Sequence, residues 1–199
     1  LLAMAAVTFI VYWWFMGFSS TNLVPALAAA LVMLVAGFFF AAVSGYLVGL
    51  IGSSNNPISG LTLSTLVIAA ILMVILGAKG IPGVTAVLAV AGVICVAAAV
   101  AGEMLQDLKV GHILGGTPWK MQVGDLIGVI VSSLVMWIPL FILNAGDLKM
   151  AALKGYKGGF GGEVLAAPQA GLMANLSRGI VGGEMVWPLI VVGIVMAIG

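Results

Sequence analysis

Charged residues are scarce in this chain of 199 residues: only 7% are Asp, Glu, Lys or Arg, whereas 63% are hydrophobic. Soluble domains carry about 25% charged residues, so this chain has too few polar groups to cover a surface in water. Its net charge of +1 leaves no basic face of the kind that nucleic-acid binding requires. We therefore predict an integral membrane protein that does not bind nucleic acid.

Cysteine and histidine are almost absent, with one residue of each. The single Cys95 excludes a disulfide within the chain and a Cys-rich metal site. Membrane-embedded hydrolases need a catalytic set, such as H-E-x-x-H at metal spacing or a serine with a histidine base. With His112 alone and no H-E-x-x-H motif, we expect no enzymatic activity, no cofactor and no protein-bound metal.

Long apolar runs are what the chain does contain, and about 20 such residues cross a bilayer. Four complete runs span about 25–51, 58–76, 82–102 and 123–144, with shorter runs over 1–17 and from about 185 onward. The chain also opens without the basic leader of a signal peptide. We predict an all-α polytopic membrane protein in one domain over 1–199, a segment of a longer protein. It should hold about six transmembrane helices, the first and last truncated, with polar connections near 52–57, 103–122 and 146–183.

The stretch from Gly52 to Thr65 contains the first connection and is a strongly polar interruption between two long apolar segments. It reads G-S-S-N-N-P-I-S-G-L-T-L-S-T. In hydrocarbon every freed N–H and C=O needs a partner, so broken backbone persists only inside protein or beside water. One interpretation is an ordinary loop at the headgroups. The other is a discontinuous or re-entrant helix whose Asn55 and Asn56 face a translocation path. The hydroxyls of Ser59 and Thr62 would either extend that surface or bond to carbonyls of their own helix.

The second connection concentrates ionisable groups. If the helix continues, Glu103 and Asp107 lie four residues apart on one face. Paired carboxylates at a membrane boundary can relay protons or hold a cation, or are simply solvated where a helix leaves the bilayer. His112 is a proton-sensitive group near neutral pH. Asp125, near the start of the next run, is either a buried acid or a helix N-terminal charge, and the second is favoured because acids stabilise that end.

Four motifs in order carry a resemblance to a known family: N-N-P-I-S-G-L-T at 55–62, Q-D-L-K-V-G-H at 106–112, T-P-W-K-M-Q at 117–122 and A-P-Q-A at 167–170. Together they resemble the oligopeptide transporter superfamily, and most closely its prokaryotic members related to the yellow stripe-like branch. The resemblance covers most of the chain. Family members are much longer, so this chain corresponds to an internal stretch toward the C-terminal half.

The resemblance implies a secondary active transporter in a prokaryotic plasma membrane that takes up oligopeptides or peptide-like metal chelates together with protons. Any metal would travel inside the substrate. A membrane channel and a non-transporting structural subunit stay open as alternatives, and so does a homo-oligomer. The candidate residues are Asn55, Asn56, Pro57, Ser59 and Thr62 for the substrate path, and Glu103, Asp107 and His112 for proton coupling.

Overall fold

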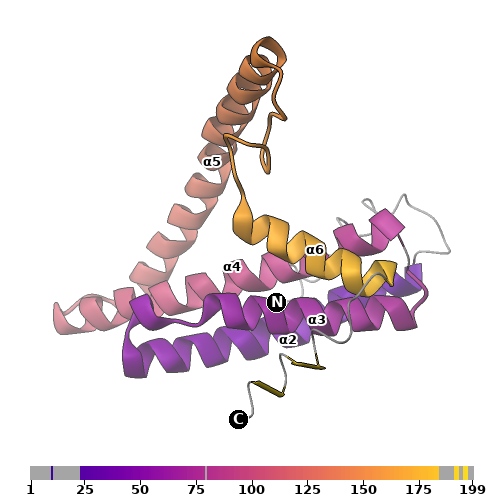
Figure 1. The fold of residues 1–199 in the computed structure, drawn as a ribbon. Coiled ribbons are helices and arrows are strands. Elements are labelled where there is room, and N and C mark those ends of the chain that lie inside the picture. The colour runs from indigo at the N-terminus through magenta and orange to yellow at the C-terminus, as the bar shows by residue number, and fades with distance from the viewer. Residues whose placement is uncertain (1–9, 11–22, 79, 184–190, 193–194, 197–199) are drawn as a thin grey trace. The chain divides into compact units, whose positions relative to one another are not determined.

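A computed structural model describes residues 10, 23–78, 80–183, 191–192 and 195–196, and these residues contain no strand. The predicted all-α fold is confirmed. The predicted end runs, over 1–17 and from about 185, lie almost entirely outside the described residues. The elements, in order, are α2 (Leu23–Ile51), the 3-10 turn η2 (Ser53–Asn55), α3 (Ile58–Ile75), α4 (Gly80–Ile113), α5 (Pro118–Lys154) and α6 (Pro168–Gly182) (Figure 1).

Four of the described helices are long and apolar enough to cross a membrane, over Leu27–Ile51, Ile58–Ile75, Gly80–Ile113 and Pro118–Lys154. They coincide with the four complete runs of the sequence, so the predicted polytopic membrane architecture is confirmed. Helices α4 and α5 have 34 and 37 residues, which corresponds to roughly 51 and 56 Å at 1.5 Å per residue. Since the hydrocarbon core is about 30 Å thick, both helices continue beyond it.

The helices extend further into the predicted polar connections than the apolar runs indicate. Helix α4 includes residues 103–113, α5 includes 118–122 and 146–154, and most of the remaining connection forms α6. Charged residues have good helix propensity, so polarity marks where a helix leaves lipid and not where its backbone ends.

Glycine geometry is what ends α4. Gly115 has a left-handed φ of 78°. Its N–H donates to the His112 carbonyl over 3.2 Å, and the Gly116 N–H donates to the Gly111 carbonyl over 2.6 Å. This is the bond pattern of a Schellman motif, which satisfies the last carbonyls of a helix. Pro118 then opens α5, where its missing N–H costs nothing.

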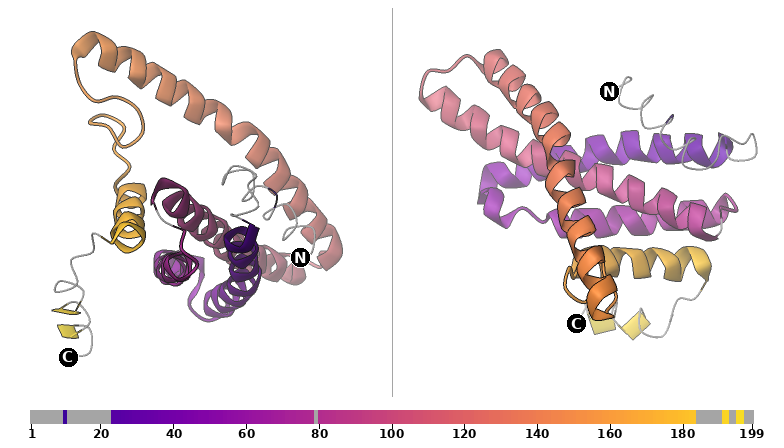
Figure 2. Two further views of the ribbon diagram at one scale, coloured as in Figure 1. Left: turned by 90° about the vertical axis from the view of Figure 1, so that its right-hand side faces the viewer. Right: turned by 90° about the horizontal axis from the view of Figure 1, so that it is seen from above.

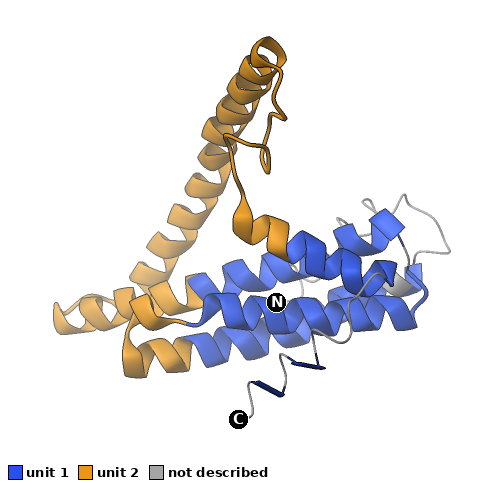
Figure 3. Cartoon of the chain, viewed as in Figure 1, with its two compact units in different colours: residues 1–44, 57–99, 173–199 blue, residues 45–56, 100–172 orange. Residues whose placement is uncertain are grey.

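The chain divides into two compact units (Figure 3). Unit 1 comprises Leu1–Ser44, Pro57–Ala99 and Met173–Gly199, and unit 2 comprises Gly45–Asn56 and Val100–Leu172.

Unit 1 is a helical bundle in which α2, α3 and the first part of α4 run alongside one another (Figures 1 and 2). Small residues let the helices approach closely, as is usual where lipid tails are as apolar as the side chains. The buried Ser44 hydroxyl also donates to the Ala98 carbonyl over 2.6 Å and thereby joins α2 to α4. The core consists of Ala29, Met33, Leu66, Ala69, Ala70, Met73, Ala86, Val87, Val90, Ala91, Ile94 and Val181.

Unit 2 contains the turn after α2, the end of α4, helix α5 and the connection from α5 to the first residues of α6. Most residues that the sequence singles out as ionisable or hydrogen-bonding candidates belong to this unit.

Candidate functional site

The turn after α2 satisfies its own backbone. Gly52 has a φ of 84°, and its N–H donates to the Val48 carbonyl over 3.0 Å. The N–H groups of Asn55 and Asn56 donate to the carbonyls of Gly52 and Ser53 over 3.3 and 3.1 Å. These three backbone N–H groups are therefore paired within the turn and the end of α2.

The two asparagine side chains of this turn differ in exposure. Asn55 is exposed, and its Nδ2 donates to the Ile51 carbonyl over 3.2 Å, at the end of α2. Asn56 is partly buried, and its Oδ1 is buried. Asn55 is therefore the carboxamide of this pair that a passing solute reaches more easily.

The hydroxyls in the first turns of α3 have mostly structural partners. The Thr62 side chain is only 6% exposed, and its hydroxyl donates to the Ile58 carbonyl over 2.7 Å. Ser64 makes the same kind of bond to its own helix. Ser59 is exposed, and Pro57 precedes the first residue of α3. The Thr62 hydroxyl is therefore used by a bond within its own helix, as one of the two interpretations predicts. The Ser59 hydroxyl, in contrast, is accessible.

The length of the flanking helices locates the turn relative to the spans. Leu27–Ile51 has 25 residues and Ile58–Ile75 has 18, and each is apolar enough to cross by itself. By length and composition, the turn therefore lies between two helices that could each be a span.

The second group of candidates lies around the turn from α4 to α5, where there is a groove of about 580 Å³. Asp107 of α4 and Asp125 of α5 both line it. Its glycines come from the Schellman turn, and Met121 packs against Gly111, where a side chain would collide with it. The complete lining is Asp107, Val110, Gly111, Leu114, Gly115, Gly116, Met121 and Asp125.

For Asp125, the position in the structure differs from the one that the sequence favoured. Helix α5 begins at Pro118, so Asp125 lies in its second turn, whereas the helix macrodipole acts mainly within the first. The favoured interpretation as an N-terminal charge was wrong for this reason. The Oδ2 atom is buried and has no hydrogen-bond partner among the described residues. Asp125 is therefore a partly buried acid, which is closer to the alternative interpretation.

The structure does not bring all three proton-coupling candidates together. Glu103 and His112 are exposed and do not line the groove, whereas Asp107 does. Nowhere in the described part of the chain do three or more His, Cys, Asp or Glu side chains gather as they would around a metal ion. The groove therefore combines two carboxylates with an apolar wall formed by Val110, Leu114 and Met121.

Comparison with known proteins gives one family. The family model described as "OPT oligopeptide transporter protein" matches residues 1–199. A protein of Haemophilus influenzae named "Putative oligopeptide transporter" is 32% identical over 177 residues, which cover 79% of this chain and 26% of that protein. The chain thus spans about a quarter of the length of this relative. No solved structure matches the chain.

Proposed function

The chain belongs to the OPT oligopeptide transporter family, and from this premise we propose that it forms part of a secondary active transporter for oligopeptides or peptide-like metal chelates. The observation that carries the proposal is the family match along the whole chain, together with four helices able to span a membrane. The protein is a multi-pass membrane protein, and we propose the prokaryotic plasma membrane as its location. The proposal includes no enzymatic step.

For the substrate path we propose the turn after α2 and the first residues of α3. A peptide presents amide N–H and C=O groups, which neutral carboxamides and hydroxyls can pair without a net charge. The exposed Asn55 and Ser59 support this assignment most directly. Thr62 supports it least, because its hydroxyl already donates to Ile58. The proposed residues remain Asn55, Asn56, Pro57, Ser59 and Thr62.

For coupling we propose that a co-transported proton is taken up by acids near the turn from α4 to α5. Asp107 has the best support among Glu103, Asp107 and His112, because its carboxylate shares a groove with Asp125. Acids that lie together near a membrane are typical of proton relays and cation sites. We also propose that the protein belongs to the yellow stripe-like branch and that metal chelates are among its substrates. A homo-oligomeric assembly is a further part of the proposal.

Uptake into proteoliposomes that contain the full-length protein tests this function. We expect saturable uptake of a peptide or chelate that accumulates against its gradient when a proton gradient is imposed. In Asp107→Asn, accumulation should be lost while exchange of labelled for unlabelled substrate continues, because exchange needs no net proton movement. Glu163→Gln, which changes an exposed acid outside the groove, is the matched control.

Two results would contradict the proposal. A flux that never saturates with substrate concentration would indicate a channel. Full gradient-driven accumulation in Asp107→Asn would remove that residue from coupling, and the same pair of assays on Glu103→Gln and His112→Ala would then decide between the remaining candidates.

A further inference from the structure

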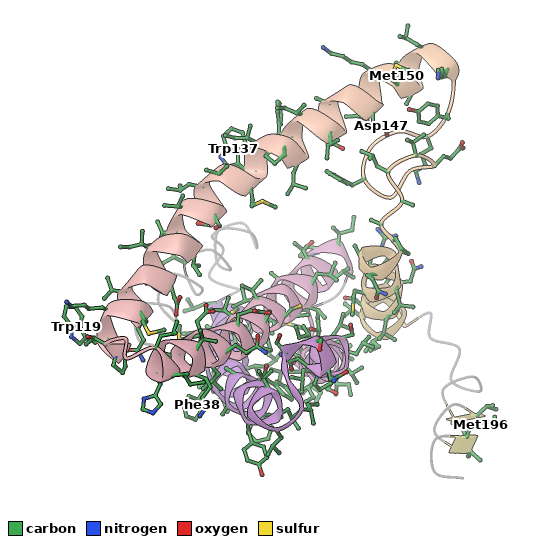
Figure 4. The ribbon with its side chains drawn as sticks, turned by 90° about the vertical axis from the view of Figure 1, so that its left-hand side faces the viewer. Phe38, Trp119, Trp137, Asp147, Met150 and Met196 are labelled. Atoms are coloured by element: carbon green, nitrogen blue, oxygen red, sulfur yellow. The ribbon has the colours of Figure 1, made fainter. Side chains whose placement is uncertain are left out.

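The connection between α5 and α6 folds back on the end of α5, around a buried acid that the sequence analysis did not single out. Asp147 is only 8% exposed. Its Oδ1 accepts a hydrogen bond from the Tyr156 hydroxyl, and its Oδ2 accepts one from the Gly159 N–H, each over 2.7 Å. Figure 4 shows Asp147 on the side of α5 toward which the connection folds back. Both oxygens of a buried carboxylate are therefore paired by this one connection.

A second side chain of α5 binds the same connection one turn earlier. The Oδ1 of Asn144 accepts a hydrogen bond from the Phe160 N–H over 3.2 Å. Asn144 and Asp147 are three residues apart, so they lie on the same face of the helix. Two successive backbone N–H groups, those of Gly159 and Phe160, are thus held by two side chains of one helix.

The glycines of this connection are required by close contact. A side chain on Gly158 would collide with that of Ala151 and would approach the Asp147 carbonyl oxygen to 3.2 Å. Gly159 has a φ of 86° and would bring a Cβ to 3.2 Å from the Asn144 Oδ1. These residues are glycine because the backbone lies directly against α5, and not because the connection has to be flexible.

Further hydrogen bonds close the connection on itself. The Gly162 N–H donates to the Gly159 carbonyl over 2.9 Å, and the Glu163 N–H donates to the Lys157 carbonyl over 3.1 Å. The Gly161 N–H donates to the Leu165 carbonyl over 2.8 Å. Residues 155–165 therefore form a compact fold that rests on Asn144 and Asp147.

We propose that residues 155–165 are a latch that opens and closes as one cooperative unit on Asp147. Partial opening is unfavourable, because losing one donor leaves a carboxylate oxygen buried without a partner. The bonds should therefore break together, as in a local unfolding unit.

Amide hydrogen exchange of the full-length protein in lipid nanodiscs, resolved to single residues, tests cooperativity. The amides of Gly159, Phe160, Gly162 and Glu163 should share one opening constant in the wild type. In Asp147→Ala all four should exchange at least about tenfold faster, because removing an acceptor from a buried bond costs enough to shift an equilibrium by that factor. In the control Glu163→Gln, which alters an exposed acid of the same connection, they should change less than about twofold.

Acceleration of Gly159 alone in Asp147→Ala would overturn the latch, since it would show an isolated bond. Unprotected amides in the wild type would overturn it as well. If Asp147→Ala does not fold, Asn144→Ala takes its place, because it leaves the carboxylate paired and should still accelerate all four amides together.

Discussion

Two polar interruptions of the same unit, the turn at 52–56 and the connection at 155–165, are held by different kinds of contact. The turn pairs its backbone with its own neighbours, as in the bond from Asn55 N–H to the Gly52 carbonyl. The connection depends on Asp147 and Asn144, which lie on the preceding helix. One segment is closed locally and the other by contacts across many residues of chain.

The comparison distinguishes buried polar side chains, whose hydrogen bonds hold the fold, from exposed ones that a solute can reach. Asp147 is buried with both carboxylate oxygens occupied, so its role is to hold the latch. Asn55 is exposed, and its side chain donates one hydrogen bond to the last residue of the preceding helix, α2. We therefore look for substrate contacts at the turn and not at Asp147.

The largest effect on stability should come from filling the contact between the connection and α5. Gly158→Val should destabilise the latch by about 3 kcal/mol or more, since overpacking costs about 1–3 kcal/mol and the lost partners of Asp147 a similar amount. Limited trypsin cleavage after Lys157 should become much faster. Gly146→Ala, where an added Cβ meets nothing within 4 Å, is the control; equal cleavage of all three proteins would show that the contact does not exist.

A smaller effect is expected at the locally closed turn. Gly52 has φ 84° and ψ 159°, a region that is essentially restricted to glycine and costs other residues about 1–3 kcal/mol. Gly52→Ala should lower the midpoint of thermal unfolding, although no atom stands within 4 Å of the added Cβ. Gly49→Ala, in the helix before the turn and equally open, should not. A midpoint equal to wild type in Gly52→Ala would contradict the backbone geometry of the turn.

The hydrogen bond from Tyr156 to Asp147 should be lost at high pH. The hydrogen bond to Asp147, with burial and the negative charges of Asp147 and Glu163, raises the pKa of Tyr156 above its usual 10.0. Because the folded pKa is the higher one, the bond contributes fully below about pH 10 and is lost as the pH rises through the folded value. The tyrosinate absorbance of wild type minus Tyr156→Phe should therefore titrate above pH 10; a midpoint at or below 10 would contradict the bond.

The smallest effect on stability is expected for Asn55→Ala. Its side chain is exposed and loses only the bond to the Ile51 carbonyl, so the change in unfolding free energy should be about 0.5 kcal/mol. Thermal unfolding in detergent measures it, with Ser54→Ala, an exposed neighbour in the same turn, as the control. A loss of several kcal/mol would mean that Asn55 holds the fold and would weaken its assignment to the path.

The fold class could be predicted from the sequence, because a long continuous apolar segment in lipid is stable as a spanning helix. Helix ends were harder to predict, since Glu103 and Asp107 continue α4 and only Gly115 with Gly116 ends it. The start of a helix was also misplaced, which explains the wrong interpretation of Asp125. Because α5 begins at Pro118, this acid is too far inside the helix to act as an end charge.

The candidate sites were predictable only in part. Residues near one another in sequence, such as Asn55 and Ser59, could be grouped by spacing alone. The groove needed Asp125 to be brought beside Asp107 by a turn between two helices. The latch was less predictable still, because a glycine-rich stretch with lysines is typical of a mobile loop, and nothing in its local pattern indicates that Asp147 binds it.

Peptide uptake by the full-length protein carrying Asn55→Ala and Asn56→Ala tests the central claim most directly, that the locally closed turn belongs to the substrate path. We predict that gradient-driven uptake falls at least about tenfold while membrane insertion and thermal unfolding stay close to wild type. Unchanged uptake in the folded double variant would contradict the account and would leave this turn as an ordinary connection between two spans.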